Sequence, residues 1–289
     1  FIRSRDQAST FIHKQTMRAS LYRGGTSKGL FLRAADLPLR LREFVPAPGG
    51  VTKSHGSRSA LDGFIAAALG SDRYGMQLNG VGGGISSTSK VCIVEESAHI
   101  DHDVDYTFGQ VDMRSGDIDW SGSCGNLASA VALFALAEGL VKSSANNQHK
   151  QATCVRVYQT NLQYSIQVIV PGEEAAEDHQ IPGVAALGRP IAVNFLEPRM
   201  PNVALLPTGN ARDIIELSPT HTARNAREHT RTNTPVSIHA SLVCAANPTI
   251  FVRASDLGLL TNPFPPHATA APLLQAKFLK RQIFTQIPR

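Results

Sequence analysis

Apolar residues alternate with polar and turn-forming residues over much of the chain, which is the pattern of half-buried β-strands. Residues 21–33 predict two strands joined by a glycine turn at Gly24 and Gly25. Further strands are predicted over residues 91–94, 104–113 (with a kink at Gly109), 155–158, 164–170, 191–195, 203–206 and 236–243. The chain is therefore expected to be rich in β-structure.

Two segments have a helical pattern instead. Residues 60–69 predict a helix that stops at Gly70, and residues 127–138 predict a longer helix that ends at Gly139, a residue suited to a left-handed cap. The longer segment, LASAVALFALAE, is apolar on almost every side. Because a helix without a polar face must be surrounded by protein, the first half is predicted to be one buried helix wrapped by strands.

Changes in composition divide the chain. Residues 172–190 turn acidic and rich in proline and glycine, which predicts an N-terminal half over residues 1–185 and a partial C-terminal half over residues 186–289. Residues 40–57 predict a loop for the same reason. The proline-rich segment from residue 259 to 272 and the basic tail after it have no predicted partner element.

The overall composition excludes several classes of protein. Of the 289 residues, 42% are hydrophobic and 18% are charged, enough to bury a substantial core. The four cysteines have no CxxC spacing, which excludes a disulfide scaffold or zinc finger and indicates a reducing compartment. With 6% aromatic residues there is little to stack on bases, so nucleic-acid binding is not expected.

Charge and hydropathy suggest the kind of partner. A net charge of +5 fits an anionic small substrate, and no apolar run reaches the length of a membrane span, so no membrane partner is expected. We expect a cytoplasmic protein. The basic segment 1–23 also resembles a transit peptide, which leaves a mitochondrial location open.

Two glycine-containing clusters could carry chemistry. Residues 23–29, RGGTSKG, lack the order and spacing of a phosphate loop and read alone as a turn. Residues 82–90, GGGISSTSK, combine glycines that let a ligand approach the backbone with hydroxyl groups that can bind carboxylate oxygens. Lys90 precedes an apolar run, and partial desolvation there would make it a usable proton-transfer base. The alternative is a surface loop with an ordinary lysine.

A third cluster, residues 120–126 (WSGSCGN), opens the apolar helix. The first turn of a helix offers unpaired N–H groups and a partial positive charge, which suit an anion and favour thiolate over thiol. Cys124 is therefore the most plausibly reactive cysteine. The alternative, a buried structural cysteine, fits Cys92, Cys154 and Cys244 better.

A metal site lacks its usual signature. The histidines have neither HxxxH nor HExxH spacing. We therefore expect no metal site.

In combination, the motifs resemble the PrpF family of methylitaconate and aconitate isomerases and oxalomesaconate tautomerases. They are RGGTSKG, GVGGGISSTSKV, VDYTFGQVD, WSGSCGNLASAV, LLPTGN and AANPTIFVRASDLG, and they follow one another in order between Met17 and Leu259. The resemblance implies an α+β fold similar to diaminopimelate epimerase. In that fold two alike halves each wrap a β-sheet around a central helix, with the active site between them.

The resemblance also implies an activity and a site. The activity is a cofactor-free shift of a C=C bond in a polycarboxylate, a small-molecule partner, by allylic proton transfer. Lys90 and Cys124 match the family's catalytic residues. Its substrate-lining motifs contain Ser27, Lys28, Ser87, Thr88, Gly125 and Asn126. No cofactor is implied, and the oligomeric state is left open, a homodimer included.

The resemblance weakens toward the C-terminus. No counterpart of the family's second central helix or its SMG-type motif follows Leu259, so the second half is expected to be truncated. Two alternatives therefore stay open: a carboxylate-binding paralogue without turnover, and an epimerase or racemase with two cysteines. The second is disfavoured because Cys244 lies in a strand-like run with no helix after it.

Overall fold

The computed structural model describes residues 17–49, 59–141, 152–172, 174–217 and 236–257. The chain forms two compact units, Phe1–Pro198 and Arg199–Arg289, called unit 1 and unit 2 below. The predicted strand near residues 191–195 is present and belongs to unit 1, where it pairs with an earlier strand.

Unit 1 is built around one mixed sheet. Its described elements are β1 (Ser20–Gly24), β2 (Ser27–Arg33), η1 (Ala34–Asp36), α1 (Leu39–Arg42), α2 (Ala60–Leu69), η2 (Ser86–Thr88), β3 (Lys90–Glu96), β4 (Val104–Val111), β5 (Ile118–Asp119), α3 (Gly125–Ala137), β6 (Thr153–Gln159), β7 (Tyr164–Val170), β8 (His179–Gln180), β9 (Leu187–Gly188) and β10 (Ala192–Leu196). The sheet order is β1-β2-β3-β4-β6-β7-β10, with β5 beside β4. The pairs β2–β3 and β4–β6 are parallel and the others antiparallel.

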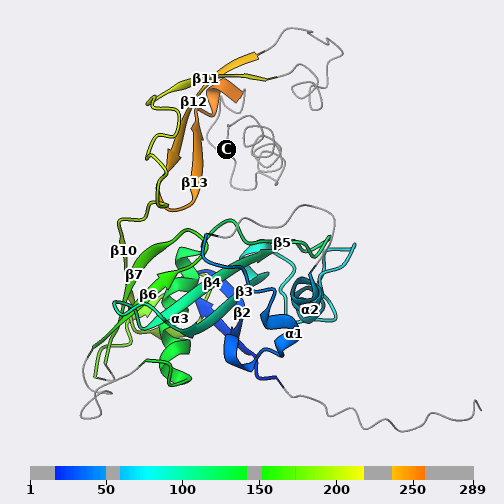
Figure 1. Ribbon diagram of the computed structural model, residues 1–289, viewed down its shortest axis with the longest axis vertical. Helices are drawn as coiled ribbons and strands as arrows, with labels where there is room; N and C mark the ends of the chain where they lie inside the picture. Colours follow the sequence, from blue (N-terminus) through cyan, green and yellow to red (C-terminus); the bar gives the residue numbers. More distant parts are fainter. Residues whose placement is uncertain (1–16, 50–58, 142–151, 173, 218–235, 258–289) are drawn as a thin grey trace, which may run out of the picture. The chain divides into compact units, whose positions relative to one another are not determined.

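The sheet curves around α3, as Figure 1 shows. Seven side chains of this helix are buried, most of them alanine: Leu127, Ala128, Ala130, Val131, Ala132, Phe134 and Ala135. The small side chains let strands approach the helix on several sides. The ring of Phe134 packs against the ring of Phe31 in β2, with 5.4 Å between the ring centroids. The helix ends before Gly139, whose φ of 66° is left-handed. The prediction of a buried helix wrapped by strands is confirmed.

The sheet has two faces with different neighbours. Side chains alternate along a strand, so Phe31 and its register partner Cys92 lie on the side covered by α3, called the α3 face. Leu30, Leu32, Val91 and Ile93 lie on the other side, where they pack with Leu61, Ile65 and Leu69 of α2; this is called the α2 face. Helix α2 spans residues 60–69, as predicted, and stops at Gly70 in the left-handed conformation.

Unit 2 is described as a small antiparallel sheet. It contains β11 (Asp213–Leu217), β12 (Val236–Cys244), β13 (Pro248–Val252) and η3 (Ser255–Leu257), in the order β11-β12-β13. Its buried hydrophobic side chains alternate along β12: Ile238, Ala240, Leu242 and Cys244. Only β12 of this sheet was predicted.

Two local predictions were wrong. Residues 203–206 are irregular, with a bend at 205–206, rather than a strand, because Asn202 is left-handed with φ 62° and Pro207 follows. In the predicted loop after residue 40, the chain instead makes the short helix α1. The proline-rich segment and the basic tail lie outside the described residues. Across the described segments, no helix is long and apolar enough to cross a membrane.

Candidate active site

Lys90 is the first residue of β3, and its side chain is only 8% exposed. Its Nζ donates a hydrogen bond to Oε1 of Gln110 and lies 5.4 Å from the ring centroid of Phe108. Both partners belong to β4 and share the α3 face with Lys90, because Lys90 pairs with Gln110 and Cys92 with Phe108. Lys90 is therefore buried rather than part of an exposed surface loop.

Cys124 is the N-cap of α3 and is 9% exposed. Its side chain does not cap the helix; its Sγ donates to Oγ of Ser27 at 3.7 Å. The Tyr106 hydroxyl donates to the carbonyl oxygen of Cys124 at 3.5 Å. The first-turn N–H groups of a helix have no intrahelical acceptor, so the thiol lies beside a set of donors that suits an anion.

Cys92 links the surroundings of Lys90 and Cys124. Burial raises the pKa of the Cys92 thiol well above its usual value, and the nearby Cys124 raises it further. A hydrogen bond with Tyr106 and the charge of Lys90 lower it only in part. Lys90 and Cys92 lie on the same α3 face because they are two residues apart in β3, and Cys124 lies on that side through its contact with Ser27.

The neighbouring candidates Ser27 and Lys28 direct their side chains to opposite faces of the sheet. Ser27 is buried on the α3 face and contacts Cys124, and Gly29, two residues on, pairs with Lys90. Strand geometry then puts the Cα atoms of Ser27 and Lys90 about 8 Å apart. Lys28 lies between these positions, so its side chain belongs to the α2 face with Leu30. It is not brought toward Cys124.

Gly125 and Asn126 form the start of α3 and are exposed. Asn126 Nδ2 donates to Oγ1 of Thr26 at 3.1 Å, which ties the helix to the β1–β2 turn. A Cβ on Gly125 would lie 3.1 Å from Cζ of Phe195 in β10, so this aromatic ring covers the first residue of the helix.

Ser87 and Thr88 lie in η2, the turn immediately before Lys90, and are half-buried. Thr88 Oγ1 donates to the carbonyl oxygen of Ile85 at 3.1 Å. The turn is also bound to the strand that carries Lys90's partner, because Gln110 Nε2 donates to the carbonyl oxygen of Ser86 at 3.1 Å.

Sequence reasoning missed the polar side chains that organise this site. Gln77 is 2% exposed and has a φ of 52°. Its Oε1 accepts from the Gly84 N–H at 2.9 Å and from Ser89 Oγ at 2.8 Å, which holds the glycine-rich loop in place. Tyr164 of β7 donates to Oγ of Ser123 at 3.0 Å, beside Cys124. Neither Gln77 nor Tyr164 lies in a sequence motif that indicates a role at the site. The only cue was the apolar or strand-like sequence around them.

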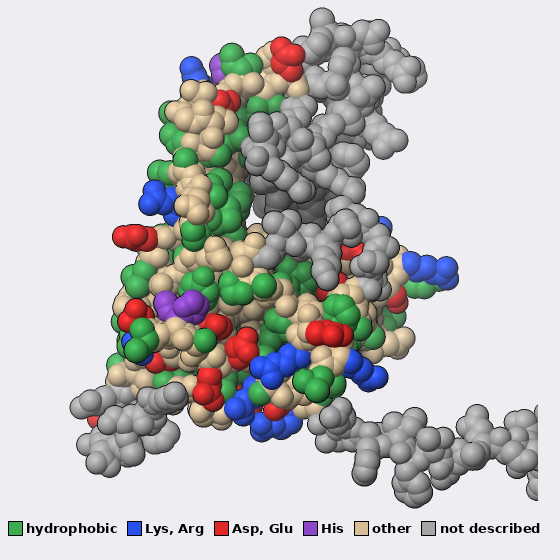
Figure 2. Space-filling view, viewed as in Figure 1, with side chains coloured by type: hydrophobic (Ala, Val, Ile, Leu, Met, Phe, Trp, Pro, Cys, Tyr) green, Lys and Arg blue, Asp and Glu red, His purple; other side chains and the backbone are tan. Residues whose placement is uncertain are grey.

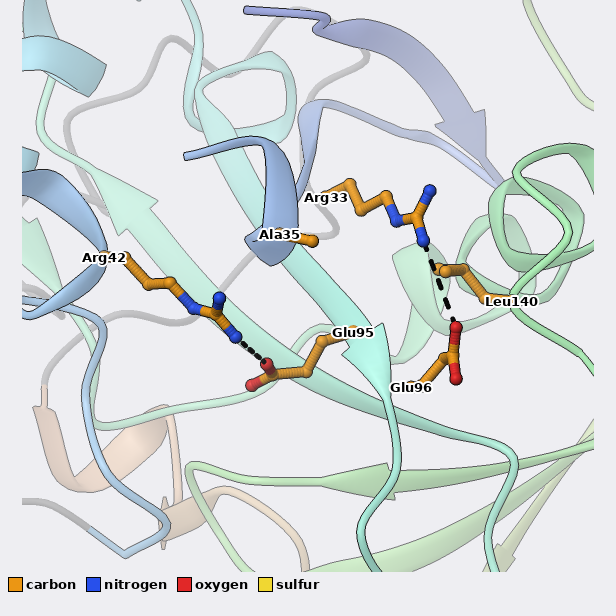
Figure 3. Close-up of a pocket in the computed structure, with 6 residues that line it drawn as sticks. All are labelled: Arg33, Ala35, Arg42, Glu95, Glu96 and Leu140. Atoms are coloured by element: carbon orange, nitrogen blue, oxygen red, sulfur yellow. Dashed lines mark ion pairs between the residues drawn. The ribbon is translucent and has the colours of Figure 1, made fainter. Parts of the chain in front are cut away.

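A separate hollow lies at the other end of β3. It is lined by Arg33, Ala35, Arg42, Glu95, Glu96 and Leu140, and Figure 3 shows its Arg33–Glu96 and Arg42–Glu95 ion pairs. Strand length puts it about 20 Å from Lys90. Positive and negative side chains are interspersed over unit 1 in Figure 2, and in this hollow they neutralise one another, so it has no excess charge to attract a carboxylate.

The remaining cysteines offer no comparable setting. Cys154 is exposed in β6, and Cys244 ends β12 in unit 2, where burial raises the pKa of its thiol. In the part of the chain that the structure describes, no three His, Cys, Asp or Glu side chains are grouped to hold a metal ion.

The fold and the site define an α+β protein in which a buried amine and the thiol of a helix N-cap residue lie on one face of a sheet wrapped around that helix. The chain matches the PrpF protein family over residues 14–283 and belongs to that family. The predicted family is therefore confirmed.

Named relatives and a solved structure agree with this assignment. The 2-methyl-aconitate isomerase of Cupriavidus necator is 36% identical over 258 residues, which cover 86% of this chain and 58% of the relative. The 3-methylitaconate isomerase of Eubacterium barkeri is 31% identical over 244 residues, covering 83% and 54%. The crystal structure of a methylitaconate-delta-isomerase matches with a TM-score of 0.57 and 29% identity, over 93% of this chain and 61% of that one.

The structural match confirms the predicted α+β, diaminopimelate epimerase-like fold class. The chain spans little more than half the length of these two named relatives.

Proposed function

We propose that this chain is a cofactor-independent isomerase that shifts a C=C bond in an aconitate- or methylitaconate-like di- or tricarboxylate. Its membership of the PrpF family and the names of its relatives support this class of reaction. The observation that carries the proposal is local: Cys124 at the start of α3 and Lys90 on β3 are both buried and both lie on the α3 face of the sheet.

In this mechanism a substrate carboxylate accepts hydrogen bonds from the first-turn N–H groups of α3, near Gly125 and Asn126. One of the two groups, Lys90 or Cys124, takes an allylic proton, and the electron pair left behind moves toward the neighbouring carbon. The donors of the first turn stabilise the enolate-like charge on the carboxylate. The other group returns a proton at the far end of the allyl system, so the double bond moves and no atom is gained or lost.

The deciding experiment follows cis-aconitate and methylitaconate in heavy water by NMR, with the purified full chain. We expect deuterium to enter the allylic position and the double bond to shift. Lys90→Met and Cys124→Ser should each remove both signals, while Cys154→Ser, which changes an exposed cysteine in β6, should retain them. Exchange that persists in both site variants would refute the assignment of these two residues.

Calorimetry on the same proteins separates turnover from binding. Aconitate that binds to the native chain and not to a Cys124→Trp variant, without any deuterium uptake, would identify a carboxylate-binding protein instead of an isomerase.

The expected partner is a small polycarboxylate and the expected location is the cytoplasm, with a mitochondrial location as the alternative; a homodimer is one of the oligomeric states to be tested. Light scattering on the purified chain tests the homodimer directly, because a monomer and a dimer differ twofold in mass. Cell fractionation tests the location.

A further inference from the structure

Gln110 is the direct polar partner of Lys90. The two residues are opposite one another in the β3–β4 register and lie on the same face of the sheet. Lys90 Nζ donates to Gln110 Oε1. One proton of the amine is therefore directed at the amide, which leaves the remaining positions on nitrogen for a substrate.

The amide orientation of Gln110 is fixed by its other contacts. Nε2 donates to the carbonyl oxygens of Ser86 at 3.1 Å and Ser89 at 3.0 Å. Carbonyl oxygens only accept hydrogen bonds, so a flipped amide would put its oxygen against two acceptors and its NH2 group against the lysine donor. Oε1 must consequently face Lys90.

The same glutamine connects the lysine to the turn that precedes it. The turn contains Ser86, Ser87 and Thr88 in η2 and is followed by Ser89. The hydroxyl of Ser89 donates a hydrogen bond to Gln77. The ring centroid of Phe108, also on β4, lies 5.4 Å from Nζ. Gln110 of β4 therefore fixes the position of Nζ and joins it to the turn at residues 86–89.

We propose that Gln110 is a positioning residue that orients the amine of Lys90 for proton transfer and fixes it relative to the 86–89 turn. This inference rests on the proposed function, in which Lys90 transfers a proton. Gln110 acts through Lys90 and does not itself touch the reacting atoms.

Competitive acetylation with isotope-coded acetic anhydride over a range of pH tests the inference without any need for turnover. Mass spectrometry follows the peptide of Lys90, with Lys28 on the α2 face as the reference within each sample. In Gln110→Glu, the added carboxylate favours the ammonium form, so the reactivity midpoint of Lys90 should move up by about one pH unit or more. In Gln110→Leu the acceptor is lost, and the midpoint should move down.

Gln167 on β7 provides matched control variants. It lies between Ile166 and Val168, which are buried, so its side chain is on the opposite, outer face of the sheet. Gln167→Glu and Gln167→Leu should leave the Lys90 profile unchanged. Unshifted profiles in both Gln110 variants, or equal shifts in the Gln167 variants, would overturn the proposal, provided that circular dichroism and the fluorescence of Trp120 show a native fold.

Turnover then separates this inference from the proposed function. We expect Gln110→Leu to lower kcat at least tenfold with a smaller change in KM, and Gln110→Glu to shift the pH optimum upward. If acetylation shifts as expected but the native chain neither exchanges deuterium nor shifts a double bond, Gln110 positions the lysine and the proposed function is wrong. If Lys90→Met keeps full isomerase activity, Lys90 is not the proton-transfer group and the positioning role in proton transfer is wrong with it. If Lys90→Met abolishes turnover but the Gln110 variants match the native enzyme in both assays, the positioning role is wrong.

Discussion

At the scale of single residues, the approach of the β1–β2 turn to helix α3 depends on a missing side chain. A Cβ on Gly24 would lie 2.2 Å from the carbonyl oxygen of Asn126 and 3.0 Å from Cα of Leu127. Both atoms belong to the backbone of the first helical turn and cannot rotate away. The contact brings Ser27 of the adjoining strand within reach of Cys124.

Gly24→Ala should therefore push the turn and the helix start apart. We expect a loss of about 1–3 kcal/mol in the free energy of unfolding, the usual range for overpacking, together with weaker substrate binding. Urea denaturation followed by Trp120 fluorescence measures the first effect and calorimetry the second. Gly188→Ala is the control, because nothing lies within 4 Å of a Cβ there; equal stability of both variants would contradict the steric argument.

The residues that form the site were predictable to different degrees. Lys90 and Cys124 stood out because each lies at the start of a strand or helix, Lys90 after a segment rich in glycine and hydroxyl residues and Cys124 beside Gly125. Gln110 and Gln77 did not, because a glutamine in or near a strand is equally suited to solvent. Their importance comes from partners 20 and 12 residues away in sequence, which only the folded chain identifies.

At the scale of elements, one carboxylate joins helix α2 to the segment that leads into the site. Asp62 accepts from the Ser59 N–H at 3.3 Å, and Ser59 Oγ accepts from the Asp62 N–H at 3.0 Å, a reciprocal capping box. The second oxygen of Asp62 accepts from Trp120 Nε1 at 3.1 Å. Trp120 begins the WSGSC segment that ends at Cys124.

Two substitutions separate these roles. Ser59→Ala removes one cap and should cost about 1 kcal/mol of the free energy of unfolding. Asp62→Ala should cost about 2 kcal/mol, because it also leaves the indole N–H of Trp120 without its acceptor. Trp120 is the single tryptophan of the chain, so only Asp62→Ala should shift the native emission spectrum. A spectrum unchanged in both variants would show that the Trp120 contact is dispensable.

A second carboxylate couples the loop before β4 to β6. Asp103 accepts from the backbone N–H of Arg156 at 2.7 Å and from its guanidinium at 2.8 Å. Burial alone would raise the pKa of Asp103, but the hydrogen bonds and charge of Arg156 outweigh it and lower the pKa below its usual value of 3.8. The folded state therefore favours the ionised carboxylate more than the unfolded state does.

This shift predicts how stability depends on pH. A lowered pKa in the folded state stabilises the protein above the unfolded value and loses that effect as the pH falls through the folded value. Asp103→Asn should lower Tm near neutral pH, and its difference from the native chain should shrink as the pH drops below about 3.8. Thermal scans across this range measure it; a difference that stays constant with pH would show that the charge is not responsible.

Elements with strong local signals were predicted well. Helix α2 has a capping serine and a terminal glycine, and α3 has an unbroken apolar run, so both were found from local sequence alone. Residues 203–206 predicted a strand because they include an apolar run. They do not form one, because the left-handed Asn202 precedes them and Pro207 follows them. Strand β13 was missed because it begins at a proline and forms by pairing with β12, a partner that a local pattern does not reveal.

At the scale of the whole molecule, the two units differ in how much core they contain. In the described part of unit 2, the buried hydrophobic side chains are Ile238, Ala240, Leu242 and Cys244; the others of the described chain belong to unit 1. A three-stranded sheet with so small an apolar face is marginally stable, whereas the sheet of unit 1 packs against a helix with seven buried side chains. The candidate site residues all lie in unit 1.

The native cysteines report on the two units separately. Cys92 is fully buried in unit 1 and Cys244 is buried in unit 2, while the exposed Cys154 serves as the reactive reference. With increasing urea, pulsed labelling with iodoacetamide should modify Cys244 first, and Cys92 only at the concentration where Trp120 fluorescence changes. The reason is that less apolar area must be exposed to open unit 2. Labelling of Cys244 and Cys92 at one common midpoint would instead mean that the two units unfold as a single cooperative structure.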